Sequence, residues 1–450
     1  MQKYADCTPA QAAWLDELPS HWQCTKIGAL FSERKSKVSD KDYAPLSVAR
    51  IGVVPQLATA VKTDAGDNRK LVCAGDFVIN SRSDRKGSCG VAKLDGSVSL
   101  INIVLTPRNG LSERYVHYLL RSQPFSEEYY RNGRGIVADL WTTRYSEMKS
   151  ILLPVPPREE QDQIVRFLDW KVSSINKLIA VKQKQIANLN EMHLSVMNDL
   201  ATHGIVKERN YVKTSMDWAC EIPAEWSISR IRNHFEILKR IAGAEGYDVF
   251  SVTQQGLKVR DINVYEGQLA ANYSGYQFVY PGEFAMNHMD LLTGGVGIAD
   301  HLGVTSPDYR VFRIFDEAHC YAPYYLKVFQ ICYRRHAFYR FGRGAANVGR
   351  WRLPADAFKN FEIPLPPYEE QIKIVQAIGD EEQKTKAAIE CLKKQIDLLN
   401  DLKTRLISDT VTGKIDVRSI EIPEYEYVDE DIDNADENLE QGADEPPKEE

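Results

Sequence analysis

The feature that most constrains the fold of this chain is a phrase of thirteen residues that occurs twice, 210 residues apart. Residues 153–165 read LPVPPREEQDQIV and residues 363–375 read IPLPPYEEQIKIV, with eight identical positions. Proline holds the residue before it in extended backbone and is excluded from helix interiors, whereas two glutamates favour the positive end of a helix dipole. Each phrase therefore predicts an extended segment followed at once by the start of a helix.

A heptad pattern follows each phrase. A stripe with alternating spacings of four and three residues runs from Leu168 to Leu200, and the same stripe, shifted by 210 residues, runs from Ile378 to Thr410. This spacing predicts a coiled-coil seam, although Lys182 and Glu382 interrupt it and indicate that pairing register matters as well as stability. The apolar seam positions expected to mediate pairing are Leu168, Ile175, Ile179, Ile186, Leu189, Ile389, Leu392, Ile396, Leu399 and Leu406.

The two predicted helices have matching ends and lengths. Each stops at a glycine signal, THG at 202–204 and TGK at 412–414. Roughly 40 residues at about 1.5 Å per residue make a rod of about 60 Å. Because the two stripes share length and period, we expect the helices to pair antiparallel within one chain. A homodimeric coiled coil is the alternative.

The repeat extends upstream of the helices. The segment WLDELPSHWQCTKIGALF from Trp14 matches WACEIPAEWSISRIRNHF from Trp218, GDFVIN matches GEFAMN, and YRNGRG matches YRFGRG. Between these landmarks the copies differ, and short apolar alternations there predict strands mixed with a few helices. We therefore expect an α+β fold with a pseudo-two-fold internal repeat. Its parts are globular domains at 1–157 and 204–367, long helices at 158–203 and 368–414, and an acidic tail at 415–450.

Charge is unevenly distributed along the chain. Residues 421–450 hold fourteen acidic side chains against one lysine, so the first 420 residues carry 55 basic and 49 acidic side chains. Such a tail is typical of disordered, solvated segments, with electrostatic mimicry of nucleic acid as the alternative. Eight cysteines without a CxxC pair are expected to be reduced, and the absence of a signal-like start or membrane-length apolar stretch predicts a cytoplasmic protein without membrane contact.

The doubled motifs resemble those of a known family. The tandem W-x-x-E-[IL]-P-x-x-W motifs, the G-[DE]-F segments, the [IL]-P-[VL]-P-P-x-E-E-Q phrases and the paired helices resemble the specificity subunit of type I restriction-modification enzymes over about residues 10–415. The resemblance implies two target-recognition domains, each reading half of a split, asymmetric double-stranded DNA site, with two antiparallel coiled-coil helices setting the gap. It also implies a non-catalytic chain without cofactors, which docks two DNA-methyltransferase subunits and, through them, restriction-translocation subunits.

The two G-R-G turns are the best matched candidates for DNA contact. Arg134 and Arg343 are flanked by glycines that allow close backbone approach, and Trp141 and Trp351 follow at nearly equal distances. Arginine and lysine contact phosphates, whereas Arg, Lys, Asn or Gln can read base edges. We expect both arginines to contact DNA phosphates. The alternative is a structural turn in which the arginine packs on the tryptophan.

Other basic stretches are further candidates. The loop 80–90 presents Arg82, Arg85 and Lys86, with a merely solvated turn as the alternative, but its counterpart at 287–297 has no lysine or arginine. There, Asn287, together with His288, is expected to contact bases unless the loop is used differently. The basic and aromatic stretch of the second domain is expected to contact the DNA backbone unless it is only a surface helix; its arginines are Arg334, Arg335, Arg340 and Arg350. Weaker candidates are Arg34, Lys35 and Lys37, which are matched loosely by Lys239 and Arg240 in the second domain.

Several enzyme signatures are absent from the sequence. There is no GxxxxGK[ST] phosphate loop, no Asn-Pro-Pro-[Tyr/Phe] motif, and no HExxH, and the nine histidines show no metal-ligand spacing. We therefore predict no catalytic residues and no metal site, and we expect His193 to be a packed seam residue. A coiled-coil scaffold that binds proteins and an enzyme with an unrecognised site remain as alternatives.

Overall fold

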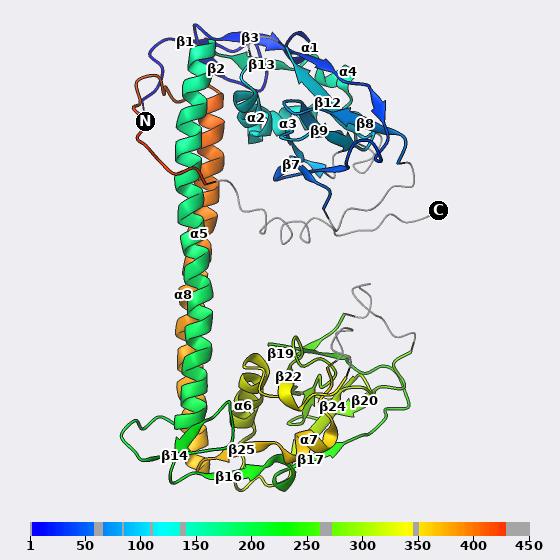
Figure 1. Ribbon diagram of the computed structural model, residues 1–450, viewed down its shortest axis with the longest axis vertical. Helices are drawn as coiled ribbons and strands as arrows, with labels where there is room; N and C mark the ends of the chain where they lie inside the picture. The colour runs from blue at the N-terminus through cyan, green and yellow to red at the C-terminus, as the bar shows by residue number, and fades with distance from the viewer. Residues whose placement is uncertain are drawn as a thin grey trace. The chain divides into compact units, whose positions relative to one another are not determined.

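The computed structural model describes residues 2–57, 66–82, 85–108, 111–135, 141–261, 272–344 and 351–428. It divides into two compact units, one formed by the residues up to Gln183 together with those from Lys393, the other by Lys184–Leu392. Each unit contains one globular domain and part of both long helices, α5 (Arg158–His203) and α8 (Tyr368–Val411) (Figure 1). None of the helices in the described part of the chain combines the length and apolarity needed to span a bilayer.

The globular part of the first unit mixes short strands with short helices. Its elements are β1 (Cys7–Pro9), β2 (Glu17–Pro19), β3 (Gln23–Lys26), α1 (Ile27–Leu30), β4 (Phe31–Glu33), β5 (Lys37–Val38), β6 (Leu46–Ala49), β7 (Gly52–Pro55), β8 (Arg69–Val72), β9 (Phe77–Asn80), β10 (Cys89–Val91), β11 (Gly96–Val98), β12 (Asn102–Pro107), α2 (Glu113–Arg121), α3 (Gln123–Arg131), α4 (Tyr145–Met148) and β13 (Leu152–Val155). Its four-stranded antiparallel sheet has the order β10-β9-β12-β4.

The second unit repeats this plan. Its elements are β14 (Tyr211–Lys213), β15 (Glu221–Pro223), β16 (Ser227–Arg230), η3 (Ile231–Asn233), β17 (Phe235–Leu238), β18 (Phe250–Thr253), β19 (Gly256–Val259), β20 (Gln277–Val279), β21 (Phe284–Met286), β22 (Val296–Ile298), β23 (Gly303–Thr305), β24 (Arg310–Ile314), α6 (Ala322–Arg334), η4 (Tyr339–Phe341), α7 (Ala355–Asn360) and β25 (Glu362–Leu365). The four-stranded sheet β22-β21-β24-β17 matches the first one strand for strand, so the predicted α+β fold with an internal repeat is confirmed.

Each sheet packs against one helix, which in turn packs against the long helices. In the first unit α2 lies between the four-stranded sheet and α5, and its Tyr115 shares a buried cluster with Phe77 of the sheet and Ile164 of α5 (Figure 1). In the second unit α6 takes this place, with Phe329 buried among Phe284 and Phe312. Fully buried aromatic side chains of this size contribute much of a domain's hydrophobic stabilisation.

The two long helices pair antiparallel within each unit. In the first unit Leu168 and Ile175, early in α5, are buried with Leu406, late in α8, and Lys403 Nζ donates to Asn176 Oδ1 at 3.3 Å. In the second unit the opposite ends meet, since Met197 and Ala201 of α5 share a cluster with Ile374 and Ile378 of α8. The apolar seam positions predicted from the heptads are all buried or half-buried, as the spacing requires.

The segment after α8 packs onto the first unit. Val417 is fully buried, and Ile415, Ile420 and Ile422 contact the same core. Gln163 Nε2 of α5 donates to the carbonyl oxygens of Val417, at 3.0 Å, and Ile420, at 2.8 Å. The segment 415–422 therefore packs apolar side chains against the first core, whereas residues 423–427 are exposed. The disordered tail from residue 415 stays a prediction. Residues 429–450, which carry most of the acidic excess, lie outside the described residues.

Candidate nucleic-acid interface

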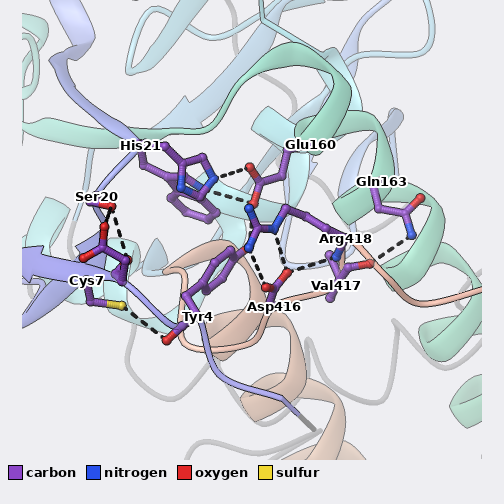
Figure 2. Close-up of polar contacts among 11 residues, drawn as sticks. Tyr4, Cys7, Ser20, His21, Glu160, Gln163, Asp416, Val417 and Arg418 are labelled. Carbon is purple, nitrogen blue, oxygen red and sulfur yellow. Dashed lines mark hydrogen bonds and ion pairs between the residues drawn. The ribbon is translucent and has the colours of Figure 1, made fainter.

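The second glutamate of the first phrase anchors the start of the chain to α5. Glu160 accepts a hydrogen bond from Tyr4 OH at 2.6 Å, and its other oxygen contacts His21 Nε2 at 2.7 Å (Figure 2). The oxygen that binds Tyr4 also accepts from Trp22 Nε1 at 3.1 Å. Burial, reinforced by the bond to Glu160, raises the pKa of Tyr4 well above its usual value, so Tyr4 stays a donor. Arg418 lies over the Tyr4 ring and pairs with Asp416. The segment after α8 thus also contacts the residues around Glu160.

Glu370 has the same role in the second unit. It accepts from Trp226 Nε1 at 2.9 Å and pairs with Arg209 Nη2 at 2.8 Å. Trp22 and Trp226 are the second tryptophans of the duplicated W-x-x-E-[IL]-P-x-x-W motifs. The glutamate of each phrase and the tryptophan of each upstream motif are therefore two halves of one contact, which explains why they recur together.

The glutamine of each phrase ties the long helix to the helix under the sheet. Gln161 Oε1 accepts from the backbone N–H of Ser112 at 2.9 Å, directly before α2, and Gln371 Oε1 accepts from that of Tyr321 at 2.8 Å, directly before α6. Both side-chain amides also donate to a proline carbonyl of their own phrase. Since both glutamines are almost fully buried, these bonds satisfy backbone groups that water cannot reach.

The acid of each G-[DE]-F segment neutralises an arginine of its own domain. Asp76, which is 2% exposed, accepts from Arg34 Nε at 2.7 Å and Nη2 at 3.1 Å. Glu283 forms the equivalent ion pair with Arg240. Each arginine compensates a buried carboxylate, which would otherwise be costly to leave unpaired. The weaker prediction that Arg34 and Arg240 contact DNA stays a prediction.

The first G-R-G turn presents an exposed arginine. The backbone N–H and C=O of Arg134 both pair with Thr142 at 2.9 Å, and its side chain is 84% exposed. Trp141 donates from Nε1 to the carbonyl of Tyr130 at 2.8 Å, with the two rings 5.9 Å apart. A Cβ at Gly133 would lie far inside van der Waals distance of the indole nitrogen, so only glycine fits there.

The second G-R-G turn is built in the same way. The backbone of Arg343 pairs with that of Arg352 at 2.8 and 3.1 Å, and the Arg343 side chain is exposed. Trp351 Nε1 donates to the carbonyl of Tyr339 at 2.6 Å, with the rings stacked 5.5 Å apart, and a Cβ at Gly342 would collide with this indole. In both turns the tryptophan packs on glycine and tyrosine instead of on the arginine, which was the alternative interpretation.

The loop 80–90 adjoins the first turn. Arg82 pairs with Thr142, the same residue that pairs with Arg134, and Lys86 Nζ lies 5.3 Å from the Tyr130 ring. Arg82, Arg85 and Lys86 line one hollow with Trp141. The structure thus brings together four of the predicted residues, all with exposed side chains, as a first-domain cationic cluster of Arg82, Arg85, Lys86 and Arg134.

The counterpart loop of the second domain is closed by its own polar groups. Asn287 Oδ1 accepts from the N–H of Met289 at 3.2 Å, and the Asn287 carbonyl accepts from Tyr333 OH at 2.7 Å. The side-chain oxygen of Asn287 is thus used by the loop, as is that of Asn80, which accepts from the N–H of Arg82. The contact of Asn287 with bases stays a prediction. This Asx turn is a local device that asparagine supplies in many loops.

His288, the neighbour of Asn287, is held neutral. Its Nδ1 is buried without a hydrogen-bond partner, and its carbonyl accepts from the N–H of Leu353 at 2.9 Å. Burial, followed by the positive charges of Arg310 and Arg352, lowers the pKa of His288 to about 4. His288 is therefore a partly buried, neutral residue of this loop. The exposed cation that pairs with Arg343 through the backbone is Arg352, which the sequence did not indicate as a candidate.

The other predicted arginines of the second domain that the structure describes line two different hollows. Arg334 lines a hollow beside Gly295, whereas Arg335 and Arg340 line a separate cavity of about 900 Å³. Arg340 is ion-paired with Asp217 and lies over the Phe341 ring at 4.7 Å, so it is engaged within the domain. Arg350 lies outside the described residues.

The chain is similar in sequence to two curated proteins. The putative type I restriction enzyme MjaX specificity subunit of Methanocaldococcus jannaschii is 24% identical over 445 residues, covering 90% of this chain and 96% of the relative. The type I restriction enzyme MjaVIII specificity subunit of the same organism is 22% identical over 428 residues, covering 90% and 95%. No family model matches the chain.

A solved structure shares the fold. One chain, described as "Structural basis underlying complex assembly and conformational transition of the type I R-M system", aligns with a TM-score of 0.59 and 13% identity. The alignment covers 88% of the present chain and 99% of that chain. The overall fold is thus shared with a protein of low sequence identity.

Proposed function

Because this chain belongs to the family of type I restriction enzyme specificity subunits, we propose that its two globular domains each read one half of a bipartite, asymmetric double-stranded DNA site. A split asymmetric site requires two unlike readers. The domains share the same sheet and helix arrangement but differ in their loops: loop 80–90 carries three lysine or arginine side chains, and loop 287–297 carries none. This difference on a common scaffold supports two separate specificities.

The observation that carries the proposal is the pair of exposed arginines on equivalent turns. Arg134 and Arg343 are each fixed through their backbone by a neighbouring strand-like bridge, and both side chains are exposed. Arg134 is 84% exposed and makes only a long contact, 3.9 Å, with Glu147. Fixed cations of this kind suit phosphate oxygens, because arginine offers a planar fork of donors. In the proposal, Arg134 and Arg343 position the DNA, while other residues of each domain read the bases.

We also propose that α5 and α8 dock two methyltransferase subunits and, through them, restriction-translocation subunits, and that the helices set the gap between the half-sites. Support comes from large apolar side chains on these helices that no part of the described chain covers: Leu178, Val181, Met192, Leu398 and Leu402 are 49–67% exposed. Exposed apolar groups in such number mark surfaces for protein partners. The catalytic groups then belong to the partner subunits, and this chain supplies recognition.

The test measures DNA affinity of the reconstituted complex against salt. We expect Arg134→Ala and Arg343→Ala each to weaken binding for all sequences and to reduce the slope of log K against log salt by about 0.9, the value for one lost phosphate contact. Arg131→Ala and Arg313→Ala are matched controls, because these exposed arginines pair with Glu128 and Glu236 in the same domains. Slopes that fall equally in the controls, or not at all in the test variants, contradict the proposal.

A further inference from the structure

Four side chains with metal-ligating atoms meet at the start of α6 in the second domain. His234 directly precedes β17, and Asp316, His319 and Cys320 lie in the turn between β24 and α6. His234 Nδ1 lies 2.6 Å from Asp316 Oδ2, and His319 Nδ1 lies 2.8 Å from Asp316 Oδ1. One ligand atom each of His234, Asp316 and Cys320 lie within 4.8 Å of one another. His234 is 7% exposed and Cys320 is 3% exposed.

We propose that this cluster binds one Zn²⁺ ion, with His234, Asp316 and Cys320 as ligands and His319 as the fourth. Imidazole nitrogen, carboxylate oxygen and thiolate sulfur form the usual ligand set of tetrahedral zinc, at about 2.0–2.3 Å. Tetrahedral bonds of this length separate ligand atoms by roughly 3.3–3.8 Å. The ion therefore requires the His234–Asp316 pair to open by about an ångström, and the His319 ring, which is 68% exposed, is free of packing that would prevent its adjustment.

The turn that carries three of the ligands is already held in place. The backbone N–H groups of His319 and Cys320 both donate to the carbonyl of Asp316, at 3.3 and 3.1 Å. The carbonyl of His319 accepts from Gln371 Nε2 at 2.7 Å, so the repeated phrase fixes this turn from α8. A preformed ligand turn lowers the conformational entropy that metal binding must remove.

His234 also has the outer partner that a metal-binding histidine needs. Its Nε2 lies 2.8 Å from Ser229 Oγ on β16, while Nδ1 faces the cluster. Such a second hydrogen bond fixes ring orientation and tautomer and is a regular feature of zinc sites. Burial raises the pKa of the Cys320 thiol to about 12, so this thiol is inert by itself, and its proton passes to solvent when a cation takes its place.

The first domain fills the same place with apolar side chains. The backbone bond from Phe315 to His234, at 3.0 Å, has its counterpart in the bond from Arg108 to Leu30, at 2.8 Å. The residue before each glutamine-bound N–H is Cys320 in the second domain and Leu111 in the first. Leu30 and Leu111 pack against the first core.

Two leucines at these positions are therefore enough for the fold of the first domain. The second domain instead has a buried histidine and a buried cysteine there, next to a carboxylate and a further histidine. Packing alone does not require these polar groups, whereas binding of a metal ion does. All four zinc positions would come from the protein, as in structural sites, so the ion would join β17 to the start of α6 and stabilise the second domain.

The test uses the full-length chain, freed of metal by a chelator and titrated with Co²⁺ as a spectroscopic probe. We expect one Co²⁺ per chain, with visible bands of a tetrahedral site and a near-ultraviolet sulfur-to-cobalt band that Cys320→Ser abolishes. One equivalent of Zn²⁺ should displace the cobalt and raise Tm. Cys220→Ser, which changes an exposed cysteine of the same unit, should leave the spectrum intact.

The double variant H234L/C320L copies the leucines of the first domain and is expected to fold without binding cobalt. Absence of a cobalt spectrum at one equivalent, or a spectrum that survives in the double variant, overturns the zinc site and leaves a hydrogen-bonded His–Asp network. Should the double variant fail to fold, Cys320→Ser decides the outcome alone, because it removes only the sulfur ligand.

Discussion

At the scale of single residues, two glycines govern how the exposed arginines are presented. Gly133 and Gly342 lack the Cβ that would push the adjacent indole away, so Trp141 and Trp351 can pack against the backbone next to each arginine. The tryptophan then donates to a carbonyl of the preceding tyrosine, which closes the turn. An arginine on such a closed turn loses less conformational entropy on meeting a phosphate than one on an open loop.

His288 makes the stability of the second domain depend on pH. A histidine of the unfolded chain has a pKa near 6.5, and burial lowers that of His288 to about 4. Above pH 6.5 both states are neutral and His288 contributes nothing. Between pH 6.5 and 4 the unfolded state binds a proton that the folded state does not, so the free energy of unfolding falls, by about 2 kcal/mol after allowing for partial exposure.

Urea unfolding of His288→Gln and of the unchanged chain, measured from pH 7 to pH 4, checks this prediction. The variant should lose the part of the decline that His288 causes. His301→Gln is the control, because the hydrogen bond to Asp300 raises the pKa of that exposed histidine and gives it the opposite sign. Equal pH profiles for His288→Gln and the unchanged chain would contradict the assignment.

At the scale of elements, the doubled phrase works as a joint. Its prolines end the last strand of each domain, its glutamate binds the upstream tryptophan, and its glutamine binds the N–H before α2 or α6. Three elements that are distant in the chain therefore meet at one turn of a long helix. The joint explains why the phrase is repeated with so few changes.

Removing the glutamine should loosen this joint. Gln371 makes three hydrogen bonds, with the N–H of Tyr321 and the carbonyls of His319 and Pro366. Gln371→Leu leaves these buried groups without partners, and we expect it to lower the free energy of unfolding by about 3 kcal/mol or more. Gln376→Leu, at an exposed position of the same helix, should change it by less than about 0.5 kcal/mol. Similar losses in the two variants would show that the hydrogen bonds contribute little.

Periodicity predicted the long helices well because it is local. The heptads of α5 and α8, their glycine ends and the proline-led starts all depend on neighbouring residues. Contacts between distant residues were not predictable in this way. Arg34 and Asp76 are 42 positions apart, and His234 and Asp316 are 82 positions apart, so only the strand order brings each pair together. The packing of Ile415, Val417, Ile420 and Ile422 on the first core was missed because the overall charge hid these apolar side chains.

At the scale of the whole molecule, one frame is used twice with different contents. The sheet orders agree strand for strand, whereas the first domain gathers Arg82, Arg85 and Lys86 beside its G-R-G turn and the second places Arg352 there. The alignment of motifs predicted this duplication, but the sequence did not show which basic residues would form ion pairs within their own domain. Arg340 and Arg240 are bound in this way.

Exchange of one domain tests whether the two halves act independently. Replacing residues 1–157 by the corresponding domain of a relative should change one half of the recognised sequence and leave the other half unchanged. Sequencing of methylated positions in a host that carries the chimaeric complex gives the result directly. A change in both halves, or in neither, would refute modular reading.

The length of the helices tests their proposed role in spacing. Seven residues inserted after Gln183 in α5 and seven after Leu392 in α8 preserve both heptad registers at the boundary between the two units. Each insertion adds about 10.5 Å of helix, or roughly three base pairs at 3.4 Å. We expect the unread gap to grow by that amount with unchanged half-sites. Length-neutral replacement of the same segments is the control, and an unaltered gap would refute the idea.

The tryptophan beside each exposed arginine has a practical consequence. Indole emission responds to nearby charge and hydration, so Trp141 and Trp351 are intrinsic fluorophores next to the two turns. A chain with Trp141→Phe keeps the reporter of the second domain, and one with Trp351→Phe keeps that of the first. Because the chain has seven tryptophans, the spectrum of each variant is subtracted from that of the unchanged chain, which isolates the removed indole. The two differences then follow ligand engagement by each half separately in real time, without any attached dye.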